Sequence, residues 1–444
     1  MTEGPEPRDA RRPSLVTAAF ATYSTNLAVA ILLFVNALVV ARSLGAEGRG
    51  DIAFLLTVAT LMGYLGSFGI QEANANLAGS RPELRRPLAS NSILFALIFG
   101  LAAAVVVVGL VAAFPAVGGE SDRVLLWAAL ASIPLVILRI YLTFLLQADY
   151  AFAITNLAWV VGPATSLAVN GLLAVLGLIT VGTALAAWIG GQALGIGLLV
   201  TYVARHAGLG RPDFRLAARS LGFGAKTHVG RFAGIGTYRV DQWFLGSISG
   251  SRELGLYSIA VSWAEMLYYL SGVLVMIQRP ELVRAQPAEA AQIAARVVRV
   301  ALLLALPIAA VLIVAAPILC ITVFGEEFRG SVDDLRILAL GVVGVVTLDL
   351  LGSALNSQRR PILASSASSV ALVVTLALDI TLIPAFGGAG AAAATALAYT
   401  AGGVTAAILF TRAIGGRLRD FVPRPTELPW LWRTVLGRFG LARR

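Results

Sequence analysis

The sequence predicts an all-α polytopic membrane protein with twelve transmembrane helices. Apolar residues make up 58% of its 444 residues and charged residues only 13%, whereas a soluble domain carries about 45–50% and about 25%. The mean hydropathy is +0.83, and the apolar residues stand in long runs separated by short polar stretches. A water-soluble fold cannot bury that much apolar surface, so a helical membrane protein is the class that fits.

The charges and the rare residue types exclude several other classes. A net charge of +10 would indicate nucleic-acid binding only if the basic residues shared a solvated face. Here they lie between apolar runs, so we expect no nucleic-acid partner. The single cysteine, Cys320, excludes an intramolecular disulfide and a cysteine metal site. His206 and His228 are the only histidines, so we expect no metal centre, and no motif indicates a cofactor.

Twelve apolar segments are each long enough to cross a hydrocarbon core about 30 Å thick. They cover residues 15–41, 50–72, 88–114, 124–147, 152–176, 181–205, 222–247, 254–278, 295–323, 335–357, 361–383 and 389–411. The seventh is the least hydrophobic. The loops between the segments are short, and the longest covers 206–221. They leave no room for a catalytic domain outside the membrane, so we do not expect an enzyme.

Basic residues set the expected orientation. Most of the 34 Lys and Arg residues fall on the side that carries both termini and the loops after every second segment. The positive-inside rule therefore predicts that both termini lie in the cytoplasm. Residues 1–14 are polar and show no cleavage pattern, so the first segment is expected to be retained. In the basic tail 412–444, Trp432, Val435, Leu436 and Phe439 form an apolar stripe, which fits either an interfacial amphipathic helix or, as the alternative, a disordered basic tail.

The chain repeats its plan with an offset near 205–210 residues. The connection Leu44–Ala53 between segments one and two has a counterpart in Ile248–Tyr257 between segments seven and eight. We therefore expect two pseudo-symmetric six-helix bundles, residues 15–205 and 222–411, joined by a cytoplasmic linker at 206–221. In transporters with this plan, the substrate site lies near the membrane midplane between the halves.

Four stretches resemble a known family. Tyr238–Gly246, Gly255–Ala260, Leu44–Gly50 and Leu382–Ala391 are similar to the corresponding helices and turns of bacterial oligosaccharide-lipid flippases. These belong to the multidrug/oligosaccharidyl-lipid/polysaccharide flippase superfamily, and the resemblance covers residues 15–412. It implies a V-shaped pair of six-helix bundles around a central cavity. It also implies that undecaprenyl-diphosphate-linked sugars are flipped by alternating access.

The seventh segment carries the strongest candidate site. At about 100° per residue, Arg231, Tyr238, Arg239 and Gln242 share one face of a helix whose other face is apolar. Arg239 and Asp241 are two residues apart and do not face each other on a helix, so each needs another partner. Ionisable residues at this depth are costly and normally face the bundle interior or water.

Further polar residues recur on other segments. Gln71 and Asn74 lie on a polar stripe of segment two, and Arg139 lies in segment four, where it could pair with Asp149 or reach the interface. The intramembrane acids that could couple transport to an ion are Glu265, Asp349, Asp379 and Asp241. Many Ser and Thr side chains in such stripes only pack or bond their own backbone.

These residues suit an anionic glycolipid. Arginine offers a planar fork to phosphate oxygens and stays charged, so we hypothesise that Arg231 and Arg239, with Arg139 as a third, hold the diphosphate. Gln71, Asn74, Tyr238 and Gln242 are the candidates for the glycan. The expected partners are an undecaprenyl-diphosphate-linked glycan and the bilayer, with a polysaccharide polymerase as a further candidate, and the expected state is a monomer. Membrane potential, ion antiport or both would drive the flipping.

Three alternatives remain open at the level of the sequence. A multidrug/cation antiporter would use membrane-embedded acids to bind cationic drugs, but the richest helix here is basic. A lipid II flippase usually has two more C-terminal helices than the twelve expected here. A membrane glycosyltransferase or polysaccharide polymerase would need larger external loops. No GxxxxGK[ST] motif is present, which argues against a self-contained ATP-driven pump.

Overall fold

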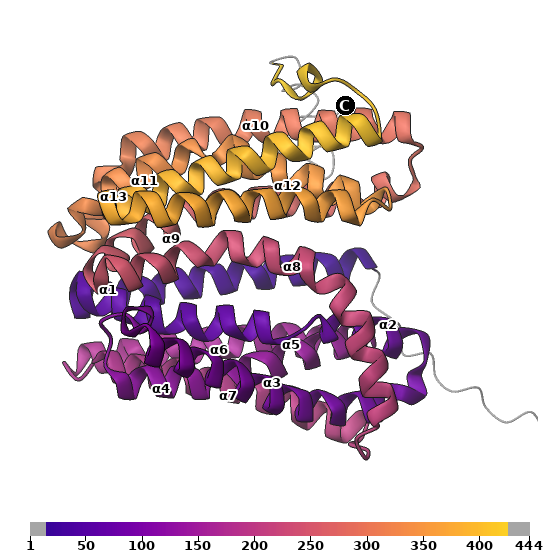
Figure 1. The fold of residues 1–444 in the computed structure, drawn as a ribbon, viewed down its shortest axis with the longest axis horizontal. Coiled ribbons are helices and arrows are strands. Elements are labelled where there is room, and N and C mark those ends of the chain that lie inside the picture. The colour runs from indigo at the N-terminus through magenta and orange to yellow at the C-terminus, as the bar shows by residue number, and fades with distance from the viewer. Residues whose placement is uncertain (1–14, 425–444) are drawn as a thin grey trace, which may run out of the picture.

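A computed structural model gives the fold of residues 15–424; side chains are described in this range except those of residues 15–21, 23, 226, 227, 229–231 and 266–270. Residues 15–424 form helices and connecting turns and contain no strand. Figure 1 shows α10–α13 gathered on one side and α3–α7 on the other, with α1, α8 and α9 between them. The predicted all-helical class is confirmed.

The first part of the chain forms seven helices. They are α1 (Leu15–Gly66), α2 (Ile70–Ser80), α3 (Arg85–Ala113), α4 (Arg123–Ala131), α5 (Ile133–Gln147), α6 (Phe152–Val175) and α7 (Val181–His206), with short 3₁₀ helices at Pro82–Leu84 and Pro115–Gly118. We call α1–α7 the N-terminal half.

The second part forms six helices. They are α8 (Phe214–Ile248), α9 (Gly250–Arg284), α10 (Pro287–Pro317), α11 (Ser331–Leu340), α12 (Val342–Ser357) and α13 (Pro361–Ala413), with a π-helical turn at Ile318–Thr322 and 3₁₀ helices at Glu326–Gly330 and Leu418–Phe421. We call α8–α13 the C-terminal half. The predicted interfacial helix of the tail lies outside the described residues.

Two glycines divide the longest helices. Gly45 in α1 has φ 69° and ψ −172°, and Gly387 in α13 has φ 53° and ψ −130°, positive-φ conformations that glycine adopts readily and residues with a Cβ rarely do. Each glycine breaks the helix between two predicted segments, so α1 and α13 each comprise two helices that meet at a sharp kink. Carboxylates sit against both kinks, Glu327 beside Gly45 and Glu253 beside Gly387.

Seven described helices are long and apolar enough to cross a bilayer, or eight if α11 and α12, bent by 46°, form one span. α1 and α13 are among the seven, and each contains its kink within that span. α8 and α9 have 35 residues each and are not among the seven, which were found among the described residues alone.

The structure differs from the predicted segments at several boundaries. The helix that begins after Gly45 ends at Gly66, and the next stretch, expected to be a loop, forms α2. α8 begins at Phe214, inside the predicted linker, because the Asp213 side chain caps it by accepting hydrogen bonds from the backbone N–H groups of Arg215 (2.9 Å) and Leu216 (3.0 Å).

The first turns of α8 are held against the N-terminal half. Asn91 and Asp213 exchange two hydrogen bonds of 2.9 Å each through the Asn91 amide and the Asp213 backbone. Gly69 and Gly224 bring α2 and α8 so close that a Cβ on Gly69 would lie 2.3 Å from the Gly224 carbonyl oxygen. α8 therefore starts beside α2 and then runs between the halves, as its bent path in Figure 1 shows.

The two halves share hydrophobic cores at one end of the molecule. This is the end with the Ile248–Gly250 turn, which we call the α8–α9 end; the opposite end, with residues 207–213, is the linker end. One core joins Phe54 of α1 and Leu130 of α4 to Leu245, Tyr257 and other residues of the C-terminal half. A second core is drawn from α9–α13 and Phe421, and a third from α2, α3, α5–α7 and Leu216.

Backbones of α1 and α9 touch at the α8–α9 end. A Cβ on Gly50 would lie 1.7 Å from the Ser251 carbonyl oxygen, and one on Gly255 would lie 1.8 Å from the Ala46 carbonyl oxygen. Ser251 also donates a 2.6 Å hydrogen bond to Asp51. The contact explains why the two connections that match in the repeat are both rich in glycine.

Replacing Gly255 with Ala should destabilise the protein. The added methyl group has no space between α1 and α9, and overpacking of this kind costs about 1–3 kcal/mol. Gly272→Ala, on the same helix but with no atom within 4 Å of the added Cβ, is the matched control. Thermal unfolding of the purified proteins checks the prediction, and equal stability of the two variants would contradict it.

Candidate functional site

An arginine and a glutamate pair between α8 and α9. The Arg239 guanidinium lies 2.9 Å from a Glu265 carboxylate oxygen, and the two side chains are 39% and 30% exposed. Arg239 lies about 14 Å along α8 from the α8–α9 end and Glu265 about 22 Å along α9, at about 1.5 Å per residue. The pair is therefore near the middle of a bilayer about 30 Å thick, and it remains accessible.

A second arginine reaches this pair from the N-terminal half. Arg49 of α1 interacts electrostatically with Glu265, which attracts it, and with Arg239, which repels it. The Nε atom of Arg49 is buried without a hydrogen-bond partner. Two cations and one carboxylate, contributed by both halves, thus interact with one another, and the Asp241 carboxylate also interacts electrostatically with Arg239. We call Arg49, Arg239 and Glu265 the cation cluster.

Asp241 bonds away from the cation cluster, into the C-terminal half. Its carboxylate accepts hydrogen bonds from the Tyr257 hydroxyl at 2.5 Å and the Thr395 hydroxyl at 3.1 Å. The expectation that Arg239 and Asp241 take separate partners is confirmed. Asp379 of α13 is fully buried nearby and interacts electrostatically with Asp241. Neither carboxylate oxygen of Asp379 has a hydrogen-bond partner.

The neighbouring residues of α8 reach two more helices. The Tyr238 hydroxyl donates a 2.9 Å hydrogen bond to Asp349 of α12, which also accepts one of 2.7 Å from Ser271 of α9. Gln242 accepts a 3.1 Å hydrogen bond from the Thr57 hydroxyl of α1. A single helical turn of α8, residues 238–242, is therefore bonded to α1, α9, α12 and α13. We call it the polar turn.

Arg139 stands apart from the cation cluster. Its guanidinium lies 4.2 Å from the centre of the Trp159 ring, a cation–π contact between α5 and α6. The possible pairing with Asp149 is not present, because Asp149 forms an ion pair with Arg85. Arg139 lies about 24 Å from the α8–α9 end by the rise of α4 and α5, which is closer to the linker end than Arg239.

The remaining candidates are less favourably placed or not described. Gln71 and Asn74 are fully buried in the N-terminal half. Asn74 donates to the Ser92 hydroxyl at 2.9 Å, so it has a structural partner, whereas the Gln71 amide has none. Arg231 lies in α8, but its side chain is outside the described residues.

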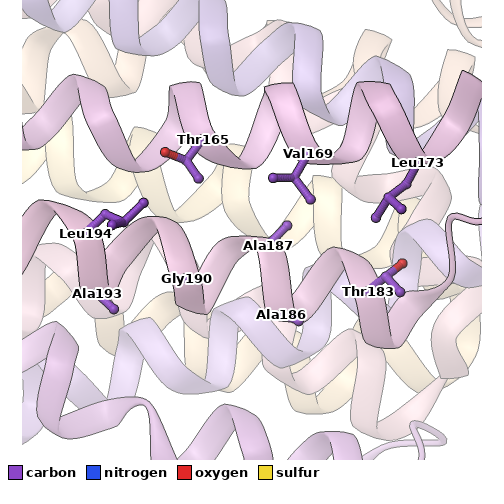
Figure 2. A pocket seen from close by; sticks show the side chains of 9 residues that line it. All are labelled: Thr165, Val169, Leu173, Thr183, Ala186, Ala187, Gly190, Ala193 and Leu194. Atoms are coloured by element: carbon purple, nitrogen blue, oxygen red, sulfur yellow. The ribbon is translucent and has the colours of Figure 1, made fainter.

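A groove between α6 and α7 has a different character. It encloses about 620 Å³, and Thr165 and Thr183 are the only polar side chains among the residues that line it. Figure 2 shows its walls, with Val169 and Leu173 of α6 opposite Ala186 and Ala187 of α7. With no charged group in its lining it is not suited to phosphate. Among the described residues, no three His, Cys, Asp or Glu side chains are grouped closely enough to hold a metal ion.

The sequence matches a family model over most of its length. Residues 39–333 match the model described as "Polysaccharide biosynthesis protein". This chain belongs to the polysaccharide biosynthesis protein family. Residues 280–428 also match the model described as "Lipid II flippase MurJ". The resemblance to flippases that the sequence suggests is thereby confirmed, whereas no curated protein matches the chain.

Solved structures of two transporters share the fold. The inward closed conformation of the lipid II flippase MurJ has a TM-score of 0.69 and 13% identity, covering 97% of this chain and 94% of that one. An inward-facing multidrug resistance MATE family transporter of the MOP superfamily has a TM-score of 0.67 and 14% identity, covering 90% and 98%. At such identities the likeness establishes the fold alone.

In this polysaccharide biosynthesis protein, the sequence pattern missed Arg49. It lies in the glycine-rich stretch that was assigned to a loop, but the helix resumes directly after Gly45 and carries Arg49 on its first turn toward α8 and α9. Tyr257 and Thr395 were missed as well, because partners of a buried acid can come from any neighbouring helix. The sequence signal that could have identified Arg49 is a single cation within Leu44–Ala53, the connection that has a counterpart in Ile248–Tyr257.

Removing the Tyr257 hydroxyl should destabilise the protein by about 1–3 kcal/mol, the cost of leaving a buried acceptor without its donor. Tyr257→Phe keeps the ring that fills the core, so the loss isolates the hydrogen bond to Asp241. Tyr150→Phe, at a ring that is 52% exposed, is the control. Thermal unfolding compares the two, and an unchanged transition for Tyr257→Phe would show that Asp241 does not depend on this bond.

Proposed function

We propose that this protein is a flippase for undecaprenyl-diphosphate-linked oligosaccharides in cell-surface polysaccharide synthesis. It would reside in the bacterial cytoplasmic membrane with both termini in the cytoplasm. The observation that carries the proposal is the cation cluster, in which Arg49 of the N-terminal half interacts electrostatically with Arg239 and Glu265 of the C-terminal half. Two guanidinium groups in one cluster suit a diphosphate, because planar forks of N–H donors match phosphate oxygens and lose no charge with pH.

The transport unit in this proposal has twelve spans in two six-helix bundles. The kinks at Gly45 and Gly387 divide α1 and α13 into two spans each, α4 with α5 and α11 with α12 each form one bent span, and α8 and α9 add two polar ones. The polar turn and the first half of α9 then lie between the bundles, where a glycan could be carried past Tyr238 and Gln242 while the lipid tail stays in the bilayer.

Shared cores at the α8–α9 end support an inward-facing arrangement. If the linker end is cytoplasmic, as the positive-inside rule predicts, the halves are closed on the outer side. Opening that side would separate Asp51 from Ser251 and would release the Ser251 backbone N–H from Glu120, to which it donates at 3.0 Å. Alternating access would therefore exchange these contacts for new ones at the linker end.

The buried acids provide a route for ion coupling. Asp379 is fully buried with both oxygens unpartnered and lies close to Asp241. An unpaired charge in such a place is unstable, so we propose that a proton or a sodium ion neutralises Asp379. Because Asp241 belongs to the same helical turn as Arg239, filling this site would bias the position of the cation cluster. Membrane potential adds about 2.3 kcal/mol per charge per 100 mV for an anion leaving the cytoplasm.

Lipid II is the second candidate substrate. The match of residues 280–428 to the lipid II flippase model favours it, and lipid II shares the undecaprenyl-diphosphate group that the cation cluster would hold. Lipid II and the polysaccharide precursor therefore differ in their glycans, and the residues that contact the glycan would select between them. Reconstitution of the protein with each lipid as the sole substrate distinguishes the two candidates. A polysaccharide polymerase would act on the glycan after translocation, so finding one as a partner would not distinguish lipid II from the other candidate substrate.

Arg239→Ala and Arg49→Ala should each reduce translocation at least tenfold, since one charge-assisted contact to phosphate contributes about 1.5–3 kcal/mol. Proteoliposomes that contain a labelled undecaprenyl-diphosphate oligosaccharide report translocation through the fraction of label accessible from outside. Arg215→Ala, at an exposed position near the start of the same helix as Arg239, should retain activity. Full translocation by both cluster variants would contradict the proposal.

Asp379→Asn should uncouple transport from its ion. Amide replacement removes the charge while keeping the shape, so substrate binding should persist, and translocation should lose its response to an imposed pH or sodium gradient at fixed membrane potential. The matched control is Asp333→Asn, whose side chain is 77% exposed. A gradient response that survives in Asp379→Asn would exclude this carboxylate as the coupling site.

A further inference from the structure

Glu265 occupies the position on Arg239 that a phosphate oxygen would take. Its carboxylate oxygen lies 2.9 Å from the guanidinium nitrogen, which is the distance of a charge-assisted hydrogen bond to a phosphate. Glu265 also attracts Arg49. This carboxylate is therefore paired with Arg239 and also attracts Arg49 electrostatically.

An anion that enters the cluster must compete with Glu265. A phosphodiester headgroup carries one negative charge, the same as the carboxylate, so replacing Glu265 on Arg239 gains it little. A diphosphate carries at least two negative charges and has oxygens on two phosphorus atoms. It can contact Arg239 and Arg49 at the same time. The Glu265 carboxylate is held to α9 by a short side chain, so it is less able to contact both arginines.

The difference matters because the membrane itself is full of phosphodiesters. Bulk phospholipids outnumber any lipid-linked intermediate, and an arginine cluster without a competing carboxylate would bind their headgroups. The exposure of Arg239 and Glu265, 39% and 30%, shows that neither is sealed inside the protein. A site that lacked an internal competitor would be occupied by the wrong lipid.

We propose that Glu265 is a specificity-determining residue that acts as a built-in competitor, so that lipid diphosphates displace it from Arg239 and Arg49 but single-charge phospholipid headgroups do not. This inference rests on the proposed function, because it concerns the same cluster. It adds a role to Glu265 that differs from ion coupling: the carboxylate screens the substrate by its charge. After release of the diphosphate, Glu265 returns to Arg239 and restores the resting cluster.

The test compares the affinities of undecaprenyl diphosphate and phosphatidylglycerol for the purified full-length protein in detergent micelles, measured by native mass spectrometry. In Glu265→Gln, the preference for the diphosphate should fall about tenfold, the factor that corresponds to one charge-assisted contact, mainly because phosphatidylglycerol binds more tightly. Glu265→Asp keeps the charge and should retain most of the preference. Glu281→Gln, exposed on the same helix, should match the unmodified protein.

The competitor role of Glu265 and the flippase function can fail separately in this experiment. A Glu265→Gln protein with an unchanged preference for diphosphate would overturn the competitor role and leave the flippase proposal standing. An unmodified protein without any preference for undecaprenyl diphosphate would overturn both. If Glu265→Gln fails to fold, Glu265→Ala decides, since it also removes the competing charge and should lower the preference, and a full preference in that variant would contradict the inference.

Discussion

The charge of Arg239 near the middle of the membrane is the constraint around which the protein is organised. A guanidinium at that depth costs about 2.5–3.5 kcal/mol on insertion scales, and it persists only with partners or water. Glu265 supplies a partner at 2.9 Å, and Arg49 makes the surroundings more positive again. Arginines of both halves are thus grouped with Glu265, and the Asp241 carboxylate also interacts electrostatically with Arg239. We propose that this grouping is the anion site.

The polar turn ties this charge to the rest of the molecule. Its residues bond to α1 through Thr57, to α9 through Tyr257 and Glu265, to α12 through Asp349 and to α13 through Thr395. A change in any of these partners therefore moves the same short stretch of α8. α8 begins against α2 of the N-terminal half and continues among the helices of the C-terminal half. Because it contacts both halves, a relative motion of the halves would also move the cation cluster.

The sequence predicted the all-helical membrane class, because hydropathy and helical periodicity depend on local sequence. The twelve spans and the division into two repeats stay predictions. Sequence reasoning also recognised that Arg239 and Asp241 need separate partners, since two residues along a helix point apart. It could not name those partners, because Glu265, Tyr257 and Thr395 come from helices whose packing is not encoded locally. Arg49 was missed because a single positive φ at Gly45 turns an apparent loop into a helix start.

In the mechanism that we propose, the diphosphate lies between Arg49 and Arg239 after displacing Glu265. A structure of the protein with undecaprenyl diphosphate bound tests this most directly. We predict phosphate oxygens within hydrogen-bond distance of both guanidinium groups and a Glu265 carboxylate that has moved off Arg239. Phosphates bound away from these arginines, with the Arg239–Glu265 pair intact, would contradict it.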